Sequence, residues 1–164
     1  MAWQYDFPTK EEKYPELLKK LDTLFNPKLT RGANISQVLA QVKKELALFW
    51  IGIYVLDEEN KLKIDVFQGD PACTEIEMGQ GACGVAAQKQ EIVNIKDVNE
   101  VDNYIACHEE TMSEIVIPGI SNNQTLFVLD IDSEKPAYFE EIDEKYLKQV
   151  ADHLVKIFEH YGGN

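Results

Sequence analysis

Apolar side chains recur at helical spacing in three stretches of the chain, residues 11–25, 35–48 and 139–160. Lysines and acids fill the other positions, so each stretch is typical of an amphipathic helix. Asn34 directly precedes the second stretch and is a favourable N-cap residue. We therefore predict N-terminal helices at about 11–48 and a C-terminal helix at about 139–160.

Between these helices, β-branched and aromatic residues are concentrated in short segments bounded by turn residues. The segments are 49–56, 61–68, 91–95, 114–120 and 125–132. The first two are joined by a polar turn at 57–60, and the last two by Asn122-Asn123, so both pairs are predicted hairpins. The order of elements predicts one α+β domain over residues 1–164, with helices packed against a mostly antiparallel sheet.

Two irregular stretches interrupt the sheet. Residues 69–84 are rich in glycine, and residues 96–106 lead to Cys107. Long connections in compact domains are usually functional or disordered. Because the first stretch also contains apolar residues and cysteines, we predict that it packs as a lid, followed by a short helix at 85–88.

Composition and charge narrow the class of protein. The chain has 164 residues, of which 45% are hydrophobic and 27% charged, as is usual for a globular domain. A formal net charge of -13 disfavours nucleic acid and anionic membranes as partners. No apolar run is long enough to span a bilayer, and Met1 to Lys10 do not resemble a secretory signal. We expect a cytoplasmic protein.

The chain has three cysteines, Cys73, Cys83 and Cys107. An odd number argues against a structural disulfide framework. No two of them form a Cys-x-x-Cys pair, so a zinc knuckle has no support, although a site that uses all three thiols stays open. They could also be small buried hydrophobic residues, or they could perform redox chemistry in which one thiol attacks and another resolves.

Acidic and aromatic pairs give further candidates. Asp130 and Asp132 share one face of a predicted strand, and Glu114 begins the neighbouring strand. If the three acids are crowded, at least one pKa should rise and that group could donate a proton. If they stay ionised, they could bind an ammonium group, and a solvated strand edge is the alternative to both. Trp50 and Tyr54 also share a face, either as core residues or as a wall around a small ligand.

Several segments resemble the free methionine-(R)-sulfoxide reductases, a family built on the GAF domain. The segments are ANIS (33–36), FWIGIY (49–54), PACTEIEMGQGACG (71–84), IACHEETMSEIVIP (105–118) and VLDIDS (128–133). The similarity runs in register from about residue 34 to the C-terminal helix and includes every cysteine and acid discussed above. It therefore implies a GAF-like fold.

The resemblance also implies roles for individual residues. Cys107 matches the nucleophile, and Cys73 and Cys83 match resolving cysteines, with Cys73 closing the first disulfide. Matches to substrate-binding positions are Glu114, Asp130 and Asp132, which also assist protonation, and the pocket aromatics Trp50 and Tyr54. The family reduces the free amino acid, needs no bound cofactor, uses thioredoxin as external reductant and often forms homodimers.

This sequence departs from the family pattern beside the nucleophile. Tyr104 and His108 stand where His and Asp are common, and Phe127 replaces a small residue before VLDIDS. Nearby acids should raise the pKa of the Cys107 thiol, and His108 could offset that effect. The alternatives to a reductase are a GAF sensory module that binds a small ligand and a thiol-based redox or metal sensor.

Overall fold

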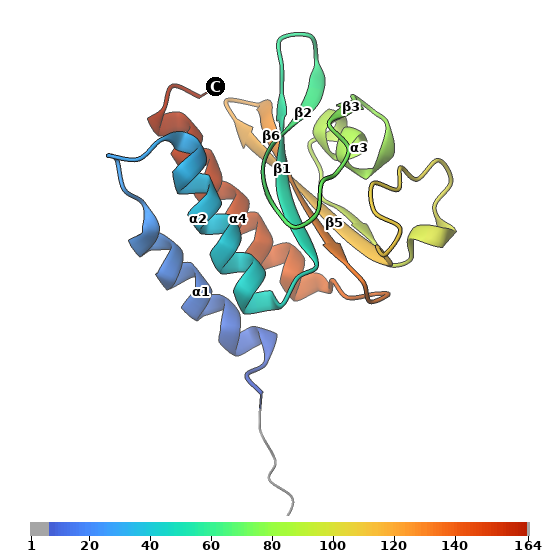
Figure 1. The fold of residues 1–164 in the computed structure, drawn as a ribbon, viewed down its shortest axis with the longest axis horizontal. Coiled ribbons are helices and arrows are strands. Elements are labelled where there is room, and N and C mark those ends of the chain that lie inside the picture. Colours follow the sequence, from blue (N-terminus) through green and yellow to red (C-terminus); the bar gives the residue numbers. More distant parts are fainter. Residues whose placement is uncertain (1–6, 164) are drawn as a thin grey trace, which may run out of the picture.

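The computed structural model describes residues 7–163; residues 1–6, part of the segment expected to lack a secretory signal, lie outside that range. Its centre is an antiparallel sheet of six strands in the order β3-β2-β1-β6-β5-β4. Helices α1, α2 and α4 cover one face of the sheet, and α3 lies on the other (Figure 1). The predicted α+β class, an antiparallel sheet with packed helices, is confirmed.

The bounds of the elements are as follows. The helices are α1 (Lys10–Leu24), α2 (Arg31–Leu46), α3 (Gly81–Lys89), the 3-10 turn η1 (Val98–Glu100) and α4 (Glu141–His160). The strands are β1 (Trp50–Leu56), β2 (Lys61–Gln68), β3 (Glu75–Glu77), β4 (Val93–Ile95), β5 (Ser113–Ser121) and β6 (Gln124–Ser133).

Strand β6 shows how alternation along a strand separates the two faces of the sheet. Phe127, Leu129 and Ile131 belong to the large apolar core under α1, α2 and α4. The Phe127 ring stacks on Phe158 of α4, with 4.8 Å between the ring centroids. Val128 belongs to the smaller apolar cluster under α3. Residue 127 therefore faces the helices rather than the side of the sheet where the cysteines lie.

Both predicted hairpins are present. Asp57 begins the β1–β2 turn, and its Oδ1 accepts hydrogen bonds from the backbone N–H groups of Glu59 and Lys61. The β5–β6 turn places Asn122 and Asn123 at φ 50° and 62°, the left-handed conformation that a two-residue hairpin turn requires. Asparagine tolerates this conformation better than most residues, so the local sequence fixes the register of the pair.

The predicted N-cap of α2 was wrong. The helix begins at Arg31, and the Thr30 hydroxyl caps it by accepting from the Ala33 N–H at 3.2 Å. Asn34 lies inside the helix and is buried. Its side chain bonds the backbone N–H and carbonyl of Asn26, at 2.9 Å and 3.0 Å. Its amide therefore satisfies the turn between α1 and α2 instead of the end of the helix.

The lid predicted at 69–84 contains more regular structure than expected. It includes β3 and the first turn of α3, which extends to Lys89 and replaces the short helix expected at 85–88. Cys83 therefore lies on a helix and not in a loop. Gly84 permits this packing, because a Cβ atom there would lie 2.3 Å from the carbonyl oxygen of Glu77. The glycines that indicated a loop instead let α3 approach the β3 connection closely.

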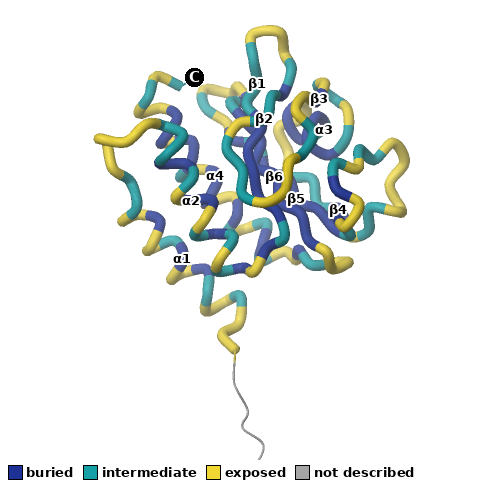
Figure 2. The backbone as a smooth tube through the Cα atoms, in the orientation of Figure 1, coloured by how far each residue is buried: buried dark blue, intermediate teal, exposed yellow. Residues whose placement is uncertain are grey.

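Figure 2 shows the buried backbone concentrated along the central strands and the helix faces that meet them, with exposed residues at the turns.

A polar contact supplements this core at α1, where the buried Tyr14 hydroxyl donates to Asp143 Oδ1 of α4 at 2.5 Å. Lys10 donates to the other oxygen of Asp143 at 2.7 Å. The carboxylate is thus paired and hydrogen-bonded, as burial of a charge requires.

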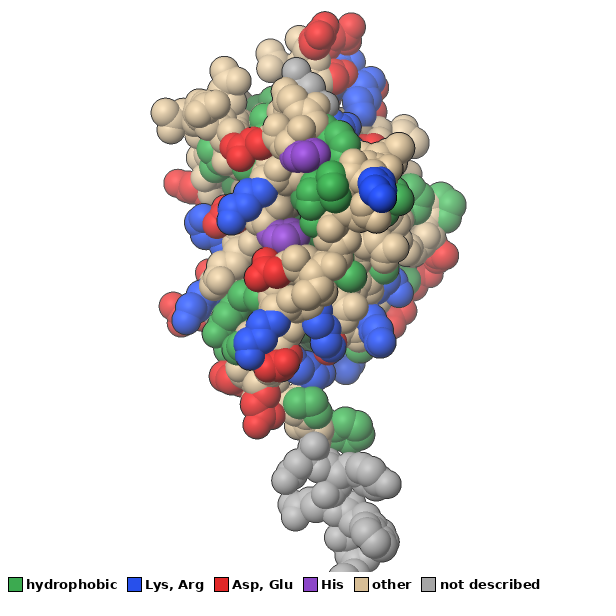
Figure 3. Space-filling model, turned by 90° about the vertical axis from the view of Figure 1, so that its left-hand side faces the viewer, with side chains coloured by type: hydrophobic (Ala, Val, Ile, Leu, Met, Phe, Trp, Pro, Cys, Tyr) green, Lys and Arg blue, Asp and Glu red, His purple; other side chains and the backbone are tan. Residues whose placement is uncertain are grey.

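The outer face of the helical layer carries positive and negative side chains interspersed with apolar ones (Figure 3). The negative charge of the chain is therefore not gathered on this face. Among the helices of residues 7–163, none has the length and apolar character needed to cross a membrane.

Gly52 on β1 makes room for the neighbouring Trp50 ring. A Cβ atom at Gly52 would lie 2.3 Å from Trp50 Cη2 and 2.8 Å from Phe67 Cβ. We expect Gly52→Ala to lower the free energy of unfolding by about 2 kcal/mol, the usual effect of overpacking. Gly32→Ala, in α2, is the matched control, since a Cβ atom there would lie 3.8 Å from its nearest neighbour, Val66 Cγ2 on β2. Urea unfolding of both variants tests this, and equal effects would contradict it.

Candidate active site

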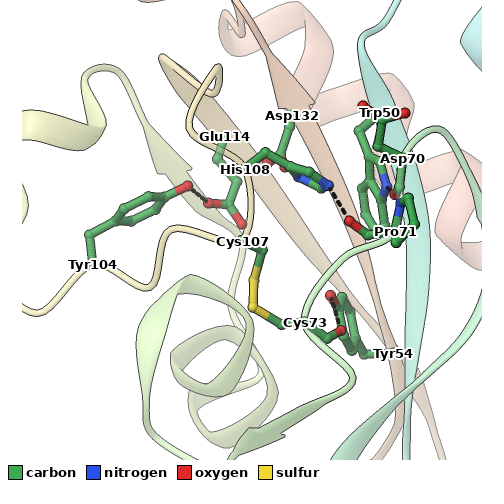
Figure 4. Close-up of a disulfide and its surroundings, with 10 residues drawn as sticks. All are labelled: Trp50, Tyr54, Asp70, Pro71, Cys73, Tyr104, Cys107, His108, Glu114 and Asp132. Carbon is green, nitrogen blue, oxygen red and sulfur yellow. Dashed lines mark hydrogen bonds and ion pairs between the residues drawn. A yellow bond between two sulfur atoms is a disulfide. The ribbon is translucent and has the colours of Figure 1, made fainter.

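The two irregular stretches meet through a disulfide bond. Cys73, which precedes β3, is bonded to Cys107, 34 positions later and ahead of β5 (Figure 4). Both residues are half-buried, while their neighbours Thr74 and Ala106 are exposed. The cysteine pattern alone left the pairing open, and the structure joins the two cysteines that the family resemblance implied for the first disulfide.

Three acids gather beneath this disulfide, on the face of the sheet that α3 covers. Glu114 on β5 lies opposite Asp132 on β6, and Asp130 is two residues back along β6 on the same face. Their exposed fractions are only 5%, 4% and 6%. The interpretation as a solvated strand edge is therefore wrong, because α3 and the two loops cover this part of the sheet.

Burial controls the protonation of this acidic cluster, which we define as Glu114, Asp130 and Asp132. Desolvation, reinforced by the charge of Asp132, raises the pKa of Glu114 to about 7. Desolvation and the charges of Glu114 and Asp132 raise the pKa of Asp130 well above its usual range. Asp130 Oδ1 and Asp132 Oδ1 have no hydrogen-bond partner. Because like charges at this separation disfavour full ionisation, the cluster retains protons near neutral pH.

Cys83 lies over the acidic cluster as a free, buried thiol of α3. Burial, followed by the charges of Asp130 and Glu114, raises its pKa well above the usual value. The ligand atoms of Cys83, Glu114 and Asp130 lie within 4.8 Å of one another, so these residues could hold a metal ion. A site of three thiols is not formed here, since two of the sulfurs are bonded together.

The two residues beside Cys107 that depart from the family pattern both contact the acidic cluster. The Tyr104 hydroxyl donates to Glu114 Oε2 at 2.6 Å. His108 Nδ1 lies 3.3 Å from Asp132 Oδ2, and its Nε2 lies 3.2 Å from the Pro71 carbonyl oxygen. The hydrogen bond to Asp132 raises the pKa of His108, which favours the imidazolium. Its charge in turn opposes the effect of burial on the pKa of Asp132.

Trp50 and Tyr54 hold the backbone of the Cys73 loop, which we define as residues 69–74. Trp50 Nε1 donates to the Asp70 carbonyl at 2.9 Å, and the Tyr54 hydroxyl donates to the Cys73 carbonyl at 2.9 Å. Both side chains are buried under the loop. They belong to the apolar cluster of this face, and their expected contact with substrate stays a prediction.

A small cavity separates the disulfide from the acidic cluster. It is lined by Ile76, Gly81, Ala82, Cys83, Tyr104, Ile105, Cys107, Glu114, Asp130 and Asp132. The centre of a water-sized sphere can occupy only about 10 Å³ of it, which is room for roughly one water molecule. The disulfide form is therefore closed to an amino acid.

Most of the apolar part of this lining could not be identified from the sequence pattern. Ile76, Ala82 and Ile105 come from β3, α3 and the loop before Cys107. The position of Ile76 could have been predicted, since it lies between two glutamates in the polar–apolar alternation that is typical of a half-buried strand. Ala82 and Ile105 lack such a pattern, because their positions follow from how α3 and the loop dock on the sheet.

Comparison with known proteins supports this description of the fold and the site. The GAF domain family model matches residues 34–159. GAF domain-containing protein A of Dictyostelium discoideum is 41% identical over 87% of this chain and 90% of its own length. The free methionine-R-sulfoxide reductase of Saccharomyces cerevisiae is 39% identical over 87% of this chain and 83% of its own.

A solved structure agrees with these relatives. The free methionine-R-sulfoxide reductase of Neisseria meningitidis, in complex with its substrate, superposes with a TM-score of 0.84 and 34% identity, over 97% of this chain and 96% of that one. The fold and the match of the GAF model to residues 34–159 thus define a GAF-domain protein. Within that class, the chain belongs to the free methionine-R-sulfoxide reductase family of oxidoreductases.

The raised pKa of Glu114 predicts how stability depends on pH. Since this pKa is about 7 in the folded protein and 4.5 without the fold, the folded state holds an extra proton between these values. Stability therefore falls as pH rises through this window, by on the order of 3 kcal/mol. We expect Glu114→Gln to remove much of this decline, as measured by urea unfolding at about pH 5 and about pH 8.

The exposed Glu110 provides the matched control for this experiment. Glu110→Gln removes one carboxylate close to Cys107 in sequence without changing the acidic cluster. Its stability should decline with pH as steeply as that of the wild type. A Glu114→Gln variant with an unchanged decline would show that Glu114 titrates normally in the folded protein.

Proposed function

We propose that this protein reduces free L-methionine-(R)-sulfoxide to methionine, with Cys107 as nucleophile. The observation that carries the proposal is the position of the Cys73–Cys107 disulfide, whose Cys107 lines the same small cavity as three buried acids. A sulfoxide needs a proton donor at its oxygen and a thiol at its sulfur. This cavity offers both within one enclosed space.

In the first step the Cys107 thiolate attacks the sulfoxide sulfur. A protonated acid of the cluster hydrogen-bonds the oxygen, and Asp130 suits this role because burial and neighbouring charges raise its pKa. The oxygen passes to Cys107, so that thiol and sulfoxide become sulfenic acid and methionine. The sulfoxide sulfur gains the two electrons that the cysteine sulfur loses.

In the second step the Cys73 thiol condenses with the sulfenic acid. The S–S bond forms and water leaves, which gives the disulfide in the structure. An external dithiol, thioredoxin, then exchanges with this bond and restores both thiols, without a bound cofactor. The half-exposed position of the two cysteines lets another protein reach them.

The buried acids also favour a free amino acid as substrate. An ionised carboxylate such as Asp132 can bind an α-ammonium group, and burial strengthens that interaction. A methionine sulfoxide within a peptide lacks this ammonium and carries flanking chain. The cover formed by the Cys73 loop and α3 excludes such a chain.

The test is a thioredoxin-coupled assay on separated R and S epimers of free methionine sulfoxide. We expect turnover of the R epimer only, and Cys107→Ser should abolish it, since a serine hydroxyl neither attacks sulfur nor forms the disulfide. Ala106→Ser, at the exposed neighbouring residue, is the matched control and should retain activity. N-acetylation of the substrate should cause loss of turnover of about tenfold or more, because it removes the charge.

Two outcomes would contradict the proposal. Turnover that survives in Cys107→Ser would remove the proposed nucleophile. Equal rates on the free and the N-acetylated R epimer would show that the acidic cluster does not select an ammonium group.

The closed cavity predicts that substrate binds only after the disulfide has opened. Cys107→Ser cannot form this disulfide and cannot consume the sulfoxide, so its cavity can open for binding. We expect titration calorimetry to detect binding of free methionine-(R)-sulfoxide to Cys107→Ser and none to the disulfide form of the wild type. Similar affinity of the two proteins would show that the cavity volume does not control access.

A further inference from the structure

His108 links the two loops that carry the disulfide. It directly follows Cys107, and its Nε2 faces the carbonyl oxygen of Pro71, two residues before Cys73, at 3.2 Å. This contact joins the same two loops that the disulfide joins (Figure 4). It does not depend on the sulfur–sulfur bond, so it can persist when that bond is reduced.

The surroundings of His108 fix its ring. The side chain is almost fully buried, with 8% exposed. Its ring centroid lies 5.5 Å from those of Phe49 and Trp50, with the Phe49 ring edge-on. Nδ1 lies 3.3 Å from Asp132 Oδ2 on β6. Held on three sides, the ring can present Nε2 to the Cys73 loop in one orientation.

The hydrogen-bond partners also select a protonation state. A backbone carbonyl can only accept, so Nε2 must carry a hydrogen to bond Pro71. Asp132 as a carboxylate likewise only accepts, so Nδ1 must carry a hydrogen as well. Only the imidazolium satisfies both contacts, because the neutral ring has one N–H. The titratable groups that face it are Asp132 from β6 and, through its charge, Glu114 from β5.

We propose that His108 is a positioning residue for the resolving step: as an imidazolium it holds the Cys73 loop beside Cys107 while the disulfide is open. Cys73 can then react with the Cys107 sulfenic acid without the loop first sampling other conformations. Proximity of this kind acts as a raised effective concentration. The inference rests on the proposed function only in assigning the attacking and resolving roles to Cys107 and Cys73.

The reaction to be measured is disulfide closure started by hydrogen peroxide. The Cys107 thiolate takes one oxygen from peroxide and becomes sulfenic acid, while hydroxide leaves. The Cys73 thiol then condenses with it and releases water. Stopped samples are alkylated and the closed form is counted by intact mass. Because methionine sulfoxide is not used, closure can be normal even if the proposed substrate is wrong.

Two neutral variants separate the two contacts of His108. The amide nitrogen of Asn corresponds to Nδ1 and keeps the contact with Asp132 alone, whereas that of Gln corresponds to Nε2 and can still reach the Pro71 carbonyl. At about pH 6 we expect closure to slow about tenfold in His108→Asn and much less in His108→Gln, the effect of losing one hydrogen bond to a charged donor. His160→Asn, at the exposed end of α4, is the control.

Peroxide is supplied at concentrations at which oxidation of Cys107 no longer limits closure, so the measured rate is that of the condensation. The ratio of wild-type to His108→Asn rates then gives its pH dependence, since titration of the Cys73 thiol cancels. The pKa of His108 is raised from 6.5 by its bond to Asp132. The contact between His108 and the Pro71 carbonyl is therefore complete below pH 6.5. As pH rises through the raised pKa, the one remaining hydrogen stays on Nδ1, beside the Asp132 carboxylate, and Nε2 no longer donates to Pro71. The ratio should fall toward one over that range.

Three results would overturn the inference. These are a His108→Asn closure rate equal to that of the wild type at about pH 6, a His108→Gln rate as low as that of His108→Asn, and a ratio that does not change with pH. If the variants fail to fold, NMR titration of His108 in the reduced wild type replaces them. A titration midpoint of His108 at or below pH 6.5 would then exclude an imidazolium that holds the Cys73 loop.

Discussion

The burial of three carboxyl groups on one face of the sheet is the constraint on which this site depends. Ionised, they would repel one another in a medium that solvates charge poorly, so protons stay bound. Each acid is then stabilised by its surroundings. Glu114 accepts a hydrogen bond from the Tyr104 hydroxyl, Asp132 lies beside His108, and burial raises the pKa of Asp130, which favours its neutral form. The fold tolerates this arrangement because the opposite face of the sheet supplies a large apolar core.

The cover over these acids is held mainly by side chains. Carbonyl oxygens of the Cys73 loop accept from Trp50, His108 and Tyr54, at Asp70, Pro71 and Cys73 in turn. Such hydrogen bonds hold a loop in place without the backbone hydrogen bonds that join strands. Each can therefore break and form again at a modest cost in free energy. A loop held in this way suits the proposed reaction, in which the site admits an amino acid and then closes on a disulfide.

Much of the architecture was predictable from local pattern. Helical periodicity located α1, α2 and α4, and the asparagine pair at residues 122–123 predicted the β5–β6 turn. The alternation in VLDIDS correctly placed Asp130 and Asp132 on one face. These features depend on spacing along one segment, which sequence displays directly. Asn34 was misassigned because its amide bonds a turn that only the packing of α2 against α1 brings within reach.

By itself the sequence determined which residues are candidates for the chemistry, because thiols and carboxyls are specified by residue type and strand face. The tertiary structure decided which of these groups meet. It paired Cys73 with Cys107, placed Cys83 on a helix above buried acids, and directed His108 to both Asp132 and the Cys73 loop. Protonation was decided at the same level, since pKa values depend on desolvation and neighbouring charge, and these exist only after α3 and the loops have closed over the sheet.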